Sequence, residues 1–237
     1  MKVAISMVRD EKDIISYTLD HMLKSADRAI ILDNGSVDGT REIIEDYSDR
    51  VKLVIDSNHE YYQSTMMTHL AYLAGEMGAE WIFPFDADEA WTIHDDWLED
   101  ADIINMSSHV YVPHKDDDNN EINPLKRINH RTSAAEPLPK VAFRYHPDVR
   151  LHMGNHGVDT PFNRHKFVQG MRHYQYRSYE QLKRKVRQGT QAVEATVLPT
   201  STCMHWRNLA VLSDLELESW WNSYVSQPEM VYDPYAC

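Results

Sequence analysis

The sequence predicts an α/β protein with a mostly parallel central sheet flanked by helices. Short apolar runs alternate with segments of helical periodicity through the first 90 residues. The connections between them are short, and this alternation is typical of parallel strands joined by right-handed crossover helices. A chain of 237 residues is also long enough to bury a core of this kind.

The first half accounts for four strands and three helices. The strands are expected at the apolar runs Lys2–Val8, Arg28–Leu32, Val51–Ile55 and Trp81–Phe85. The helices are expected over Asp13–Leu23, from Asp38 onward, and over Gln63–Met77. Asp38 is of a residue type that favours helix N-caps, so it marks the start of the second helix.

The second half has a weaker alternation and more helix near its end. Strands are expected at Lys140–Tyr145 and Phe167–Tyr176, followed by a helix over Ser178–Val193 that Ser178 caps. A terminal helix is expected over Leu209–Ser226, with an acidic face that offers a packing or homo-oligomer surface.

The net charge of −13 averages two unlike regions. Residues 1–102 carry 23 acidic and 8 basic side chains, whereas residues 122–207 carry 5 acidic and 15 basic ones. The overall acidity disfavours a nucleic-acid partner, whose usual binding surface is basic. The basic stretch instead suits a small anion such as a diphosphate.

The sequence predicts neither a membrane span nor an export signal. No run reaches the ~18–20 apolar residues that a spanning helix needs, and the charged residues Arg9–Asp13 directly follow the first apolar run. Two cysteines make neither a disulfide framework nor a zinc site. We therefore expect a cytoplasmic protein, with any membrane contact peripheral.

Carboxylates gather where the fourth predicted strand ends, at Asp86, Asp88 and Glu89. In parallel sheets ligands bind beyond the carboxyl ends of the strands. Two aspartates two residues apart supply the oxygen ligands that Mn²⁺ or Mg²⁺ prefers, and such ions share their shell with substrate phosphates. The glycine-rich dinucleotide and P-loop motifs are absent, so metal and basic side chains would hold a diphosphate here.

Three motifs in this order resemble the family 2 glycosyltransferases of the GT-A fold. Met7–Glu11 resembles the opening strand with its acidic turn, and Ile30–Thr40 resembles the D-N-G-S-x-D-G-T segment. Trp81–Glu89 resembles the D-x-D strand end. The later segments His152–His156 and His173–Leu182 are similar to a bacterial and viral subgroup.

The resemblance implies a Rossmann-like GT-A fold and transfer of a sugar from a nucleoside-diphosphate sugar, commonly a UDP-sugar. The acceptor would be a hydroxyl of a glycan, a lipid-linked glycan or a protein. Residues 1–112 would form the half that binds the nucleotide sugar. Residues 113–237 would form the acceptor-side half of the same domain and complete the metal site with C-terminal helices.

The resemblance also implies donor-binding roles. Arg9 and Glu11 would flank the ribose and base, and Asp33 would accept a hydrogen bond from the base, with Ser36 shaping the same loop. From the charge pattern, Arg177 and Lys185 are candidates for the diphosphate. Arg177 is the stronger one, because it precedes a predicted helix N-terminus that attracts anions.

The metal site would contain Asp86, on the ribose and metal side, and Asp88 as a ligand of Mn²⁺ or Mg²⁺. GT-A enzymes often take a third ligand from a distant loop. His156 is our candidate, because flanking glycines allow close backbone approach. His173 and His152 are the alternatives.

The acceptor side is less well marked in the sequence. Trp91 follows the metal motif closely and could stack on a sugar. The resemblance implies inversion, which needs a general base for the acceptor hydroxyl. The family's usual Glu-Asp pair is absent after the D-x-D, which leaves Asp148, Asp159 and Glu89 as candidates and leaves retention open.

Two other functions fit part of the pattern. A sugar nucleotidyltransferase shares the alternating fold and the metal carboxylates, but normally has a glycine-rich loop where Arg9–Glu11 stands. A non-catalytic module that binds a nucleotide or a sugar would not need the intact Asp86 and Asp88.

Overall fold

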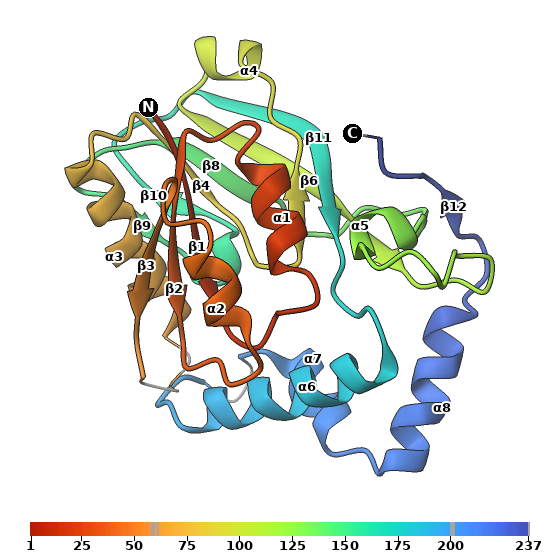
Figure 1. Cartoon of the computed structure of the whole chain (residues 1–237). Helices are drawn as coiled ribbons and strands as arrows, with labels where there is room; N and C mark the ends of the chain where they lie inside the picture. The colour runs from red at the N-terminus through yellow and green to blue at the C-terminus, as the bar shows by residue number, and fades with distance from the viewer. Residues whose placement is uncertain (58–59, 61, 200–201, 237) are drawn as a thin grey trace. The chain divides into compact units, whose positions relative to one another are not determined.

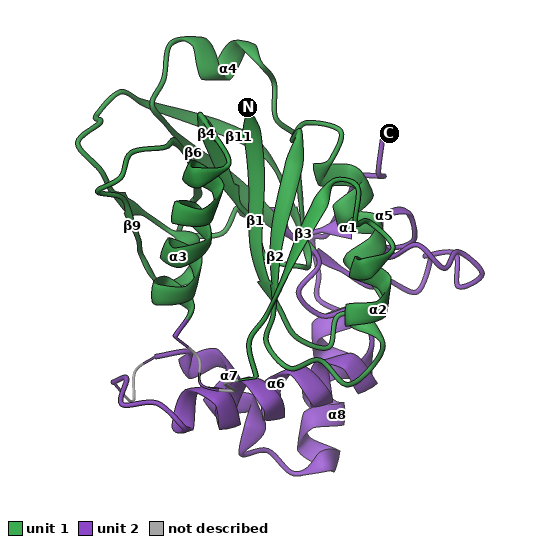
Figure 2. Ribbon diagram, turned by 60° about the vertical axis from the view of Figure 1, so that its left-hand side comes forward, with its two compact units in different colours: residues 1–57, 63–109, 134–173 green, residues 58–62, 110–133, 174–237 purple. Residues whose placement is uncertain are grey.

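The computed structural model describes residues 1–57, 60, 62–199 and 202–236 and forms two compact units. Unit 1 contains residues 1–57, 63–109 and 134–173, and unit 2 contains residues 58–62, 110–133 and 174–237 (Figure 2). The expected division at residue 112 differs from this one, because the chain returns to unit 1 over residues 134–173.

Unit 1 alternates strands and helices in the predicted order (Figure 1). Its elements are β1 (Lys2–Val8), α1 (Ile15–Met22), β2 (Arg28–Asp33), α2 (Thr40–Glu45), β3 (Val51–Ile55), α3 (Gln63–Glu76), β4 (Trp81–Pro84), β5 (Glu89–Trp91), α4 (Asp96–Glu99), β6 (Ile103–Val112, whose last three residues belong to unit 2), β8 (Lys140–Arg144), β9 (Arg150–Leu151), the 3-10 helix η1 (Met153–Asn155), β10 (Val158–Asp159) and β11 (His165–His173). The strands and helices predicted for residues 2–85 are confirmed to within two residues at their ends.

The sheet of unit 1 has a parallel part and an antiparallel part. Strands run in the order β6-β8-β4-β1-β2-β3, with β4, β1, β2 and β3 parallel and with β8 and β6 antiparallel to their neighbours. Strand β11 pairs with β5 and β6. Val8 pairs with Asp33, and Asp33 with Ile55, so the polar ends of the first three strands lie at one edge.

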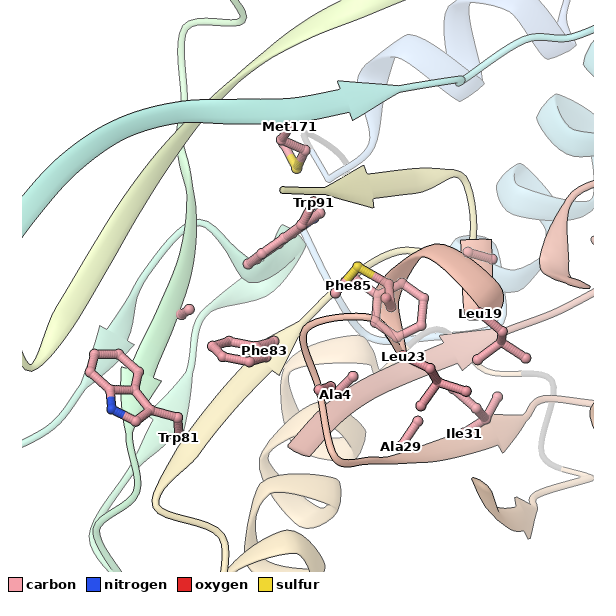
Figure 3. Packing of buried hydrophobic residues seen from close by; sticks show 14 of the residues in the cluster. Ala4, Leu19, Leu23, Ala29, Ile31, Trp81, Phe83, Phe85, Trp91 and Met171 are labelled. Carbon is pink, nitrogen blue, oxygen red and sulfur yellow. The ribbon is translucent and has the colours of Figure 1, made fainter. Parts of the chain in front are cut away.

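Helices cover both faces of the parallel strands, and the alternation of side chains explains which helix packs where. Along β1, Ala4 joins the core that contains Leu19 of α1 and Ile44 of α2. Its neighbour Ile5 joins the core on the opposite face, with Leu70 of α3. Figure 3 shows the first of these cores, in which large aromatic rings fill the space beneath β5.

Unit 2 is mainly helical. Its elements are α5 (Pro124–Arg127), β7 (His130–Arg131), α6 (Tyr179–Glu194), α7 (Met204–Ala210), α8 (Asp214–Val225) and β12 (Val231–Tyr232). The predicted helix over Ser178–Val193 is confirmed, and the Ser178 side chain caps it by accepting from the Gln181 amide.

The single terminal helix predicted over Leu209–Ser226 is wrong, because the chain forms two helices there. Helix α7 ends at Ala210 and α8 begins after Ser213. Ser213 and Glu216 form a reciprocal capping box, which starts a new helix instead of continuing the old one. Within the part of the chain that the structure describes, no helix has the length and apolarity that crossing a bilayer requires.

Candidate active site

A tight turn between β4 and β5 carries the three carboxylates of the predicted metal motif. The Glu89 amide donates to the Asp86 carbonyl across 2.9 Å, and the Asp86 amide donates to Glu89 Oε2 across 2.9 Å. Pro84, the last residue of β4, has no amide hydrogen, and the pairing of β4 with β8 ends before it, at Ile82. The strand therefore stops and the turn presents its carboxylates at the end of the sheet.

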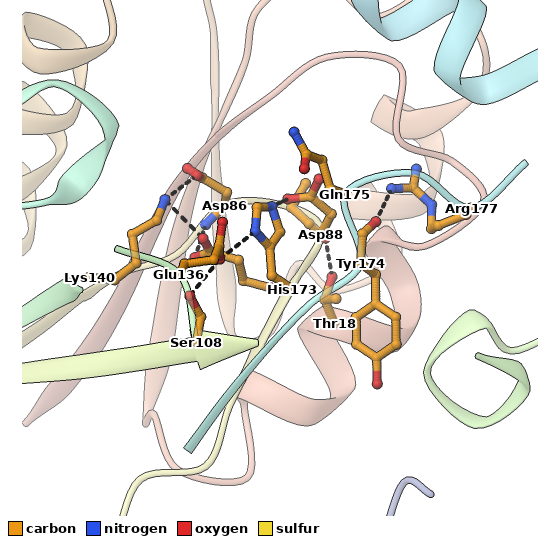
Figure 4. Close-up of polar contacts among 12 residues, drawn as sticks. Thr18, Asp86, Asp88, Ser108, Glu136, Lys140, His173, Tyr174, Gln175 and Arg177 are labelled. Carbon is orange, nitrogen blue, oxygen red and sulfur yellow. Dashed lines mark hydrogen bonds and ion pairs between the residues drawn. The ribbon is translucent and has the colours of Figure 1, made fainter. Parts of the chain in front are cut away.

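Lys140, the first residue of β8, lies among these carboxylates (Figure 4). It is only 5% exposed, and its ammonium lies 2.5 Å from Asp86 Oδ2 and 2.8 Å from Glu89 Oε1. Burial lowers the pKa of Lys140, but the charges of Asp86 and Glu89 outweigh burial and raise it overall. Lys140 is therefore a fixed positive charge in the site.

Two amides complete the surroundings of Asp86. Its Oδ1 accepts from Gln63 Nε2 across 3.2 Å and from Asn155 Nδ2 across 3.1 Å. Gln63 also accepts from the Gly154 amide across 2.8 Å. Asp86 thus ties together α3, β8 and the loop that contains η1, and both of its oxygens are engaged.

The loop from His152 to Gly157 depends on its two glycines. Gly154 has a φ of +72°, and a Cβ there would lie 2.5 Å from the His156 ring. A Cβ on Gly157 would lie 2.6 Å from His152 Nδ1. Each glycine therefore makes room for an imidazole of the same loop.

The His156 ring is fixed by a main-chain contact. Its Nδ1 lies 3.0 Å from the Pro139 carbonyl, which accepts a hydrogen bond from it. Burial lowers the pKa of His156 although the Pro139 contact opposes this, so the ring favours its neutral form. Nε2 then carries the lone pair of the neutral ring.

A second series of polar contacts leads from Ser108 through Glu136 and His173 to Asp88. Ser108 donates to Glu136 Oε2 across 2.5 Å, and the same oxygen lies 2.9 Å from His173 Nδ1. His173 Nε2 lies 3.8 Å from Asp88 Oδ1, and Asp88 is 2% exposed. These contacts orient the His173 ring, with one nitrogen toward Glu136 and the other toward Asp88.

The pKa values of Glu136 and His173 are shifted by the contact between them. Burial raises the pKa of Glu136, but the hydrogen bond and charge of His173 outweigh burial and hold it at about 2. Burial lowers the pKa of His173, but the Glu136 hydrogen bond and the Asp88 charge outweigh burial and raise it to about 9.

The first two strand-to-helix turns are tied to each other. The Asp10 amide donates to Ser36 Oγ across 3.0 Å, and the Val37 amide donates to Asp10 Oδ1 across 2.8 Å. Asp33 is 0% exposed and accepts from the Ser36 amide and from two nitrogens of Arg41, at 2.8 and 2.6 Å. Arg41, a residue that our sequence reasoning missed, therefore lies between Asp33 and solvent.

The predicted residues of the first turn lie at the same strand ends. Glu11 is buried, and its amide donates to Thr40 Oγ1 across 2.8 Å. Nε of Arg9 is buried, and it has no hydrogen-bond partner among the residues that the structure describes. Arg9, Glu11, Asp33 and Ser36 thus lie on consecutive loops at the carboxyl ends of β1 and β2.

The structure corrects two predicted roles. Trp91 is 0% exposed within the core, where its Nε1 donates to Glu89 Oε2 across 3.0 Å, so it offers no ring face to a sugar. Glu89 is equally buried, and both of its oxygens are engaged by Lys140, Asp86 and Trp91, so it is not accessible as a general base. Asp159, in contrast, has a side chain that is 69% exposed and lies 2.9 Å from His152.

The two basic candidates of the second half belong to unit 2. Arg177 precedes α6, as predicted, but it is buried and donates to the Tyr174 carbonyl across 3.0 Å. Lys185 lies on α6 and is half-buried. Their roles toward a diphosphate stay predictions.

The described residues do not assemble the predicted metal site. No group of three or more histidine, cysteine, aspartate or glutamate side chains within them is arranged to hold a metal ion. Asp86 faces Lys140, and His156 faces the Pro139 carbonyl. Asp88 is a suitable oxygen ligand for a cation that takes its other ligands from substrate and water. His173, whose pKa is raised to about 9, would have to lose its proton before it could bind an ion.

Sequence reasoning missed Lys140, Glu136, Gln63 and Asn155, and it ranked His173 behind His156. A signal existed for Lys140, because it opens the apolar run that forms β8. A lysine in a buried strand needs a carboxylate partner. Glu136 lies in an irregular segment and Asn155 ends the short 3-10 helix η1, and neither gave such a signal.

Comparison with known proteins identifies the family and agrees with the fold. The model of the family described as glycosyl transferase family 2 matches residues 4–140. The crystal structure of S. aureus TarS 1-349 in complex with UDP is similar with a TM-score of 0.50 and 12% identity, covering 96% of this chain and 73% of that one. A second crystal structure of S. aureus TarS 1-349 has a TM-score of 0.47 and 11% identity, covering 95% and 81%.

No curated protein sequence matches the chain. The TarS likeness bears on the fold alone, and it agrees with the GT-A arrangement of strands and helices in unit 1. The family match spans β1 to the start of β8, and so includes both strand-end turns and the carboxylate turn. The chain belongs to glycosyl transferase family 2 and is a glycosyltransferase of the GT-A fold.

Proposed function

We propose that this glycosyltransferase transfers a sugar from a UDP-sugar to a hydroxyl acceptor, with the help of Mn²⁺ or Mg²⁺ and with inversion at the anomeric carbon. The observation that carries the proposal is the turn from Asp86 to Glu89 at the end of β4, in a family 2 domain. It presents the two aspartates of the D-x-D pattern, Asp86 beside Lys140 and Asp88 beside His173.

The donor nucleotide would lie at the carboxyl ends of β1 and β2. The partly exposed guanidinium of Arg41 would offer donors to the edge of a base, and buried Asp33 would accept from the base only if Arg41 moved aside. The unpartnered Nε of Arg9 lies in the neighbouring turn. The TarS structure of this fold is in complex with UDP, which supports a uridine nucleotide here.

The metal would be held by Asp88, with diphosphate and water oxygens as its remaining ligands. His173 could join them only after losing the proton that its raised pKa of about 9 retains. When bound, such an ion acts as a Lewis acid that stabilises the departing nucleoside diphosphate. Glu136 would orient His173, as outer hydrogen bonds do for histidine ligands in general. His156 could act as a third ligand through Nε2, because its Nδ1 donates to the Pro139 carbonyl and the lone pair of the neutral ring lies on Nε2.

The acceptor hydroxyl would be deprotonated by Asp159. This carboxylate is exposed, whereas Glu89 is enclosed. His152 would orient it from 2.9 Å. Single-turnover rates of Asp159→Asn with donor bound test this role, because the base should affect the chemical step more than donor affinity.

The acceptor would be a glycan, a lipid-linked glycan or a protein hydroxyl in the cytoplasm, with a lipid-linked acceptor met by peripheral docking. The donor is the first target for experiment.

The decisive assay offers a panel of UDP-sugars with Mn²⁺ and measures release of UDP. We expect release with at least one donor, and we expect Asp88→Asn to lose Mn²⁺-dependent UDP binding. Pyrophosphate formation from a sugar phosphate and a nucleoside triphosphate would instead indicate a nucleotidyltransferase. Nucleotide binding without turnover of any donor would indicate a non-catalytic module and refute the proposal.

A further inference from the structure

We propose that Thr18, in the interior of helix α1, is a positioning residue of the active site: its hydroxyl holds the main-chain carbonyl of Ala87 and so fixes the carboxylate turn, residues 86–89, against the helix. The inference rests in part on the proposed function, because the carboxylate turn is taken as the place where the diphosphate of the donor binds. One arm of its test needs no substrate.

The Thr18 hydroxyl has one short contact (Figure 4). Its Oγ1 donates to the Ala87 carbonyl across 2.8 Å. The carbonyls of Ile14 and Ile15 in the same helix lie farther from Oγ1, at 3.4 and 3.2 Å. A hydroxyl has a single proton to donate, and the Ile14 carbonyl already accepts from the Thr18 amide. The proton therefore belongs to the bond with Ala87.

The surroundings of Thr18 give its hydroxyl no other purpose. Thr18 is 0% exposed and Ala87 is 5% exposed, and the nearby helix residues Ile15 and Leu19 are apolar and fully buried. Threonine is a poorer helix former than alanine or leucine. A buried hydroxyl also lowers stability unless it is hydrogen-bonded. The bond to the turn is thus the reason for a threonine at this position.

Helix α1 holds a second point of the segment that follows β4. His21 lies three residues after Thr18, on the same face of the helix. Its Nε2 lies 3.0 Å from the Trp91 carbonyl, and it must donate there because a carbonyl only accepts. The two bonds fasten the carboxylate turn and strand β5 to one face of α1.

The other end of α1 begins at the first strand-to-helix turn. The amides of Ile14 and Ile15 donate to the Glu11 carbonyl across 3.0 and 2.9 Å. Glu11 belongs to the turn at which the nucleoside is proposed to bind. Helix α1 therefore sets the spacing between the nucleoside turn and the carboxylate turn. A UDP-sugar would contact both turns at once, whereas uridine would contact the first turn alone.

The first arm of the test measures hydrogen exchange of the Asp86 and Glu89 amides by NMR, without substrate. Both amides are bonded within the turn. We expect Thr18→Val to speed their exchange about fivefold more than that of the β1 amides, the equivalent of one lost hydrogen bond. Thr18→Ser, which keeps the hydroxyl, should recover the slow exchange. Equal acceleration in the turn and in β1, or none in the turn, would overturn the inference.

The second arm measures steady-state kinetics with the UDP-sugar that the enzyme turns over. We expect Thr18→Val to lower kcat/KM at least about tenfold, because a displaced turn no longer aligns the reacting groups. The inhibition constant of uridine should change less than about twofold, since uridine does not reach the carboxylate turn. Equal losses for the UDP-sugar and for uridine, or an unchanged kcat/KM, would contradict the inference.

Thr190→Val is the matched control, because Thr190 is also a buried threonine inside a helix, α6. Its Oγ1 has no hydrogen-bond partner among the residues that the structure describes. Its loss should leave both the turn amides and kcat/KM unchanged, and an effect equal to that of Thr18→Val would overturn the inference.

Two further outcomes are also decisive. If Thr18→Val does not fold, Thr18→Ala takes its place, since alanine favours helices. Failure of both variants to fold would show that the hydroxyl serves stability alone and would overturn the inference. If the wild type turns over no UDP-sugar, the proposed function fails, and hydrogen exchange in the first arm decides whether Thr18 positions the turn.

Discussion

Replacing Glu136 with glutamine removes the charge that holds His173 as an imidazolium. Burial lowers the pKa of His173, but Glu136, which lies 2.9 Å away, together with Asp88 and Glu89 raises it from 6.5 to about 9. Since one pKa unit corresponds to about 1.4 kcal/mol, the whole shift is worth about 3 kcal/mol as an upper limit. Asp88 and Glu89 also contribute to it, so we expect Glu136→Gln to cost about 2 kcal/mol near pH 6.

The pH dependence gives the prediction its sign. A raised folded-state pKa stabilises the protein fully below the unfolded value of 6.5, and this stability is lost as pH rises through about 9. The depressed pKa of Glu136, about 2, stabilises above 4.5 and is lost as pH falls through 2. Both shifts describe one interaction and are not added together.

Urea unfolding of the wild type and of Glu136→Gln between pH 5 and pH 10 is the assay. The difference in unfolding free energy should be constant from about pH 5 to 6.5 and fall toward zero near pH 9. Glu99→Gln on the exposed surface of α4 is the control and should show little difference at any pH. A wild-type advantage that stays constant between pH 6 and pH 10 would refute the reasoning.

Three further predictions concern glycine, core and cap positions. Gly154→Ala should lower the free energy of unfolding by about 2 kcal/mol, because it adds a clash with His156 to the strain of a positive φ. Gly78→Ala should lower it by about 1 kcal/mol, because a side chain there causes the strain alone. Thermal unfolding of the two variants measures the difference, and equal losses would contradict the clash. Trp91→Phe should lower the free energy of unfolding, measured in urea, by about 1–3 kcal/mol, because it removes a hydrogen-bond donor to buried Glu89. Replacing the half-buried Trp97 with Phe should lower it less. The reverse order would show that Trp91 is not a core residue. Ser213→Ala should lower the hydrogen-exchange protection of α8 by about fivefold, the equivalent of roughly 1 kcal/mol. Ser226→Ala, at the C-terminal end of α8, should leave the protection unchanged. Unchanged protection in Ser213→Ala would contradict the capping box.

Much of unit 1 could be predicted because its information is local. The strands β1 to β4 are apolar runs of four to seven residues, and the helices between them repeat their apolar residues at helical spacing. The polar residues at the strand ends were found for the same reason, because each directly follows its strand. Helix α2 begins at Thr40 with Gly39 as its N-cap, one residue after the expected cap Asp38, which shows how small the errors were.

The charged contacts of the site could not be predicted because their partners are far apart in the chain. Lys140 lies 54 residues from Asp86, and His173 lies 37 residues from Glu136. Counting charges along the sequence located the basic residues in its second half, but it could not show which carboxylate each of them contacts. His156 was preferred over His173 for its glycines, which in the structure make room for imidazole rings.

Trp91 shows an error that the sequence could have corrected. It was expected at the acceptor side because it follows the D-x-D motif closely. In a strand, however, residues two apart point to the same face. Glu89 and Trp91 are such a pair in β5, and both are buried. When a carboxylate and an indole both point into the core, a buried hydrogen bond between them is more plausible than stacking of the indole on a sugar.

The most direct test of the account is a crystal structure with Mn²⁺ and a UDP-sugar, in which anomalous scattering locates the manganese. The account predicts a manganese peak at the Asp88 carboxylate next to His173, with Lys140 still paired to Asp86 and Glu89. A peak bound by Asp86 with Lys140 displaced, or a UDP-sugar bound away from this turn, would contradict it.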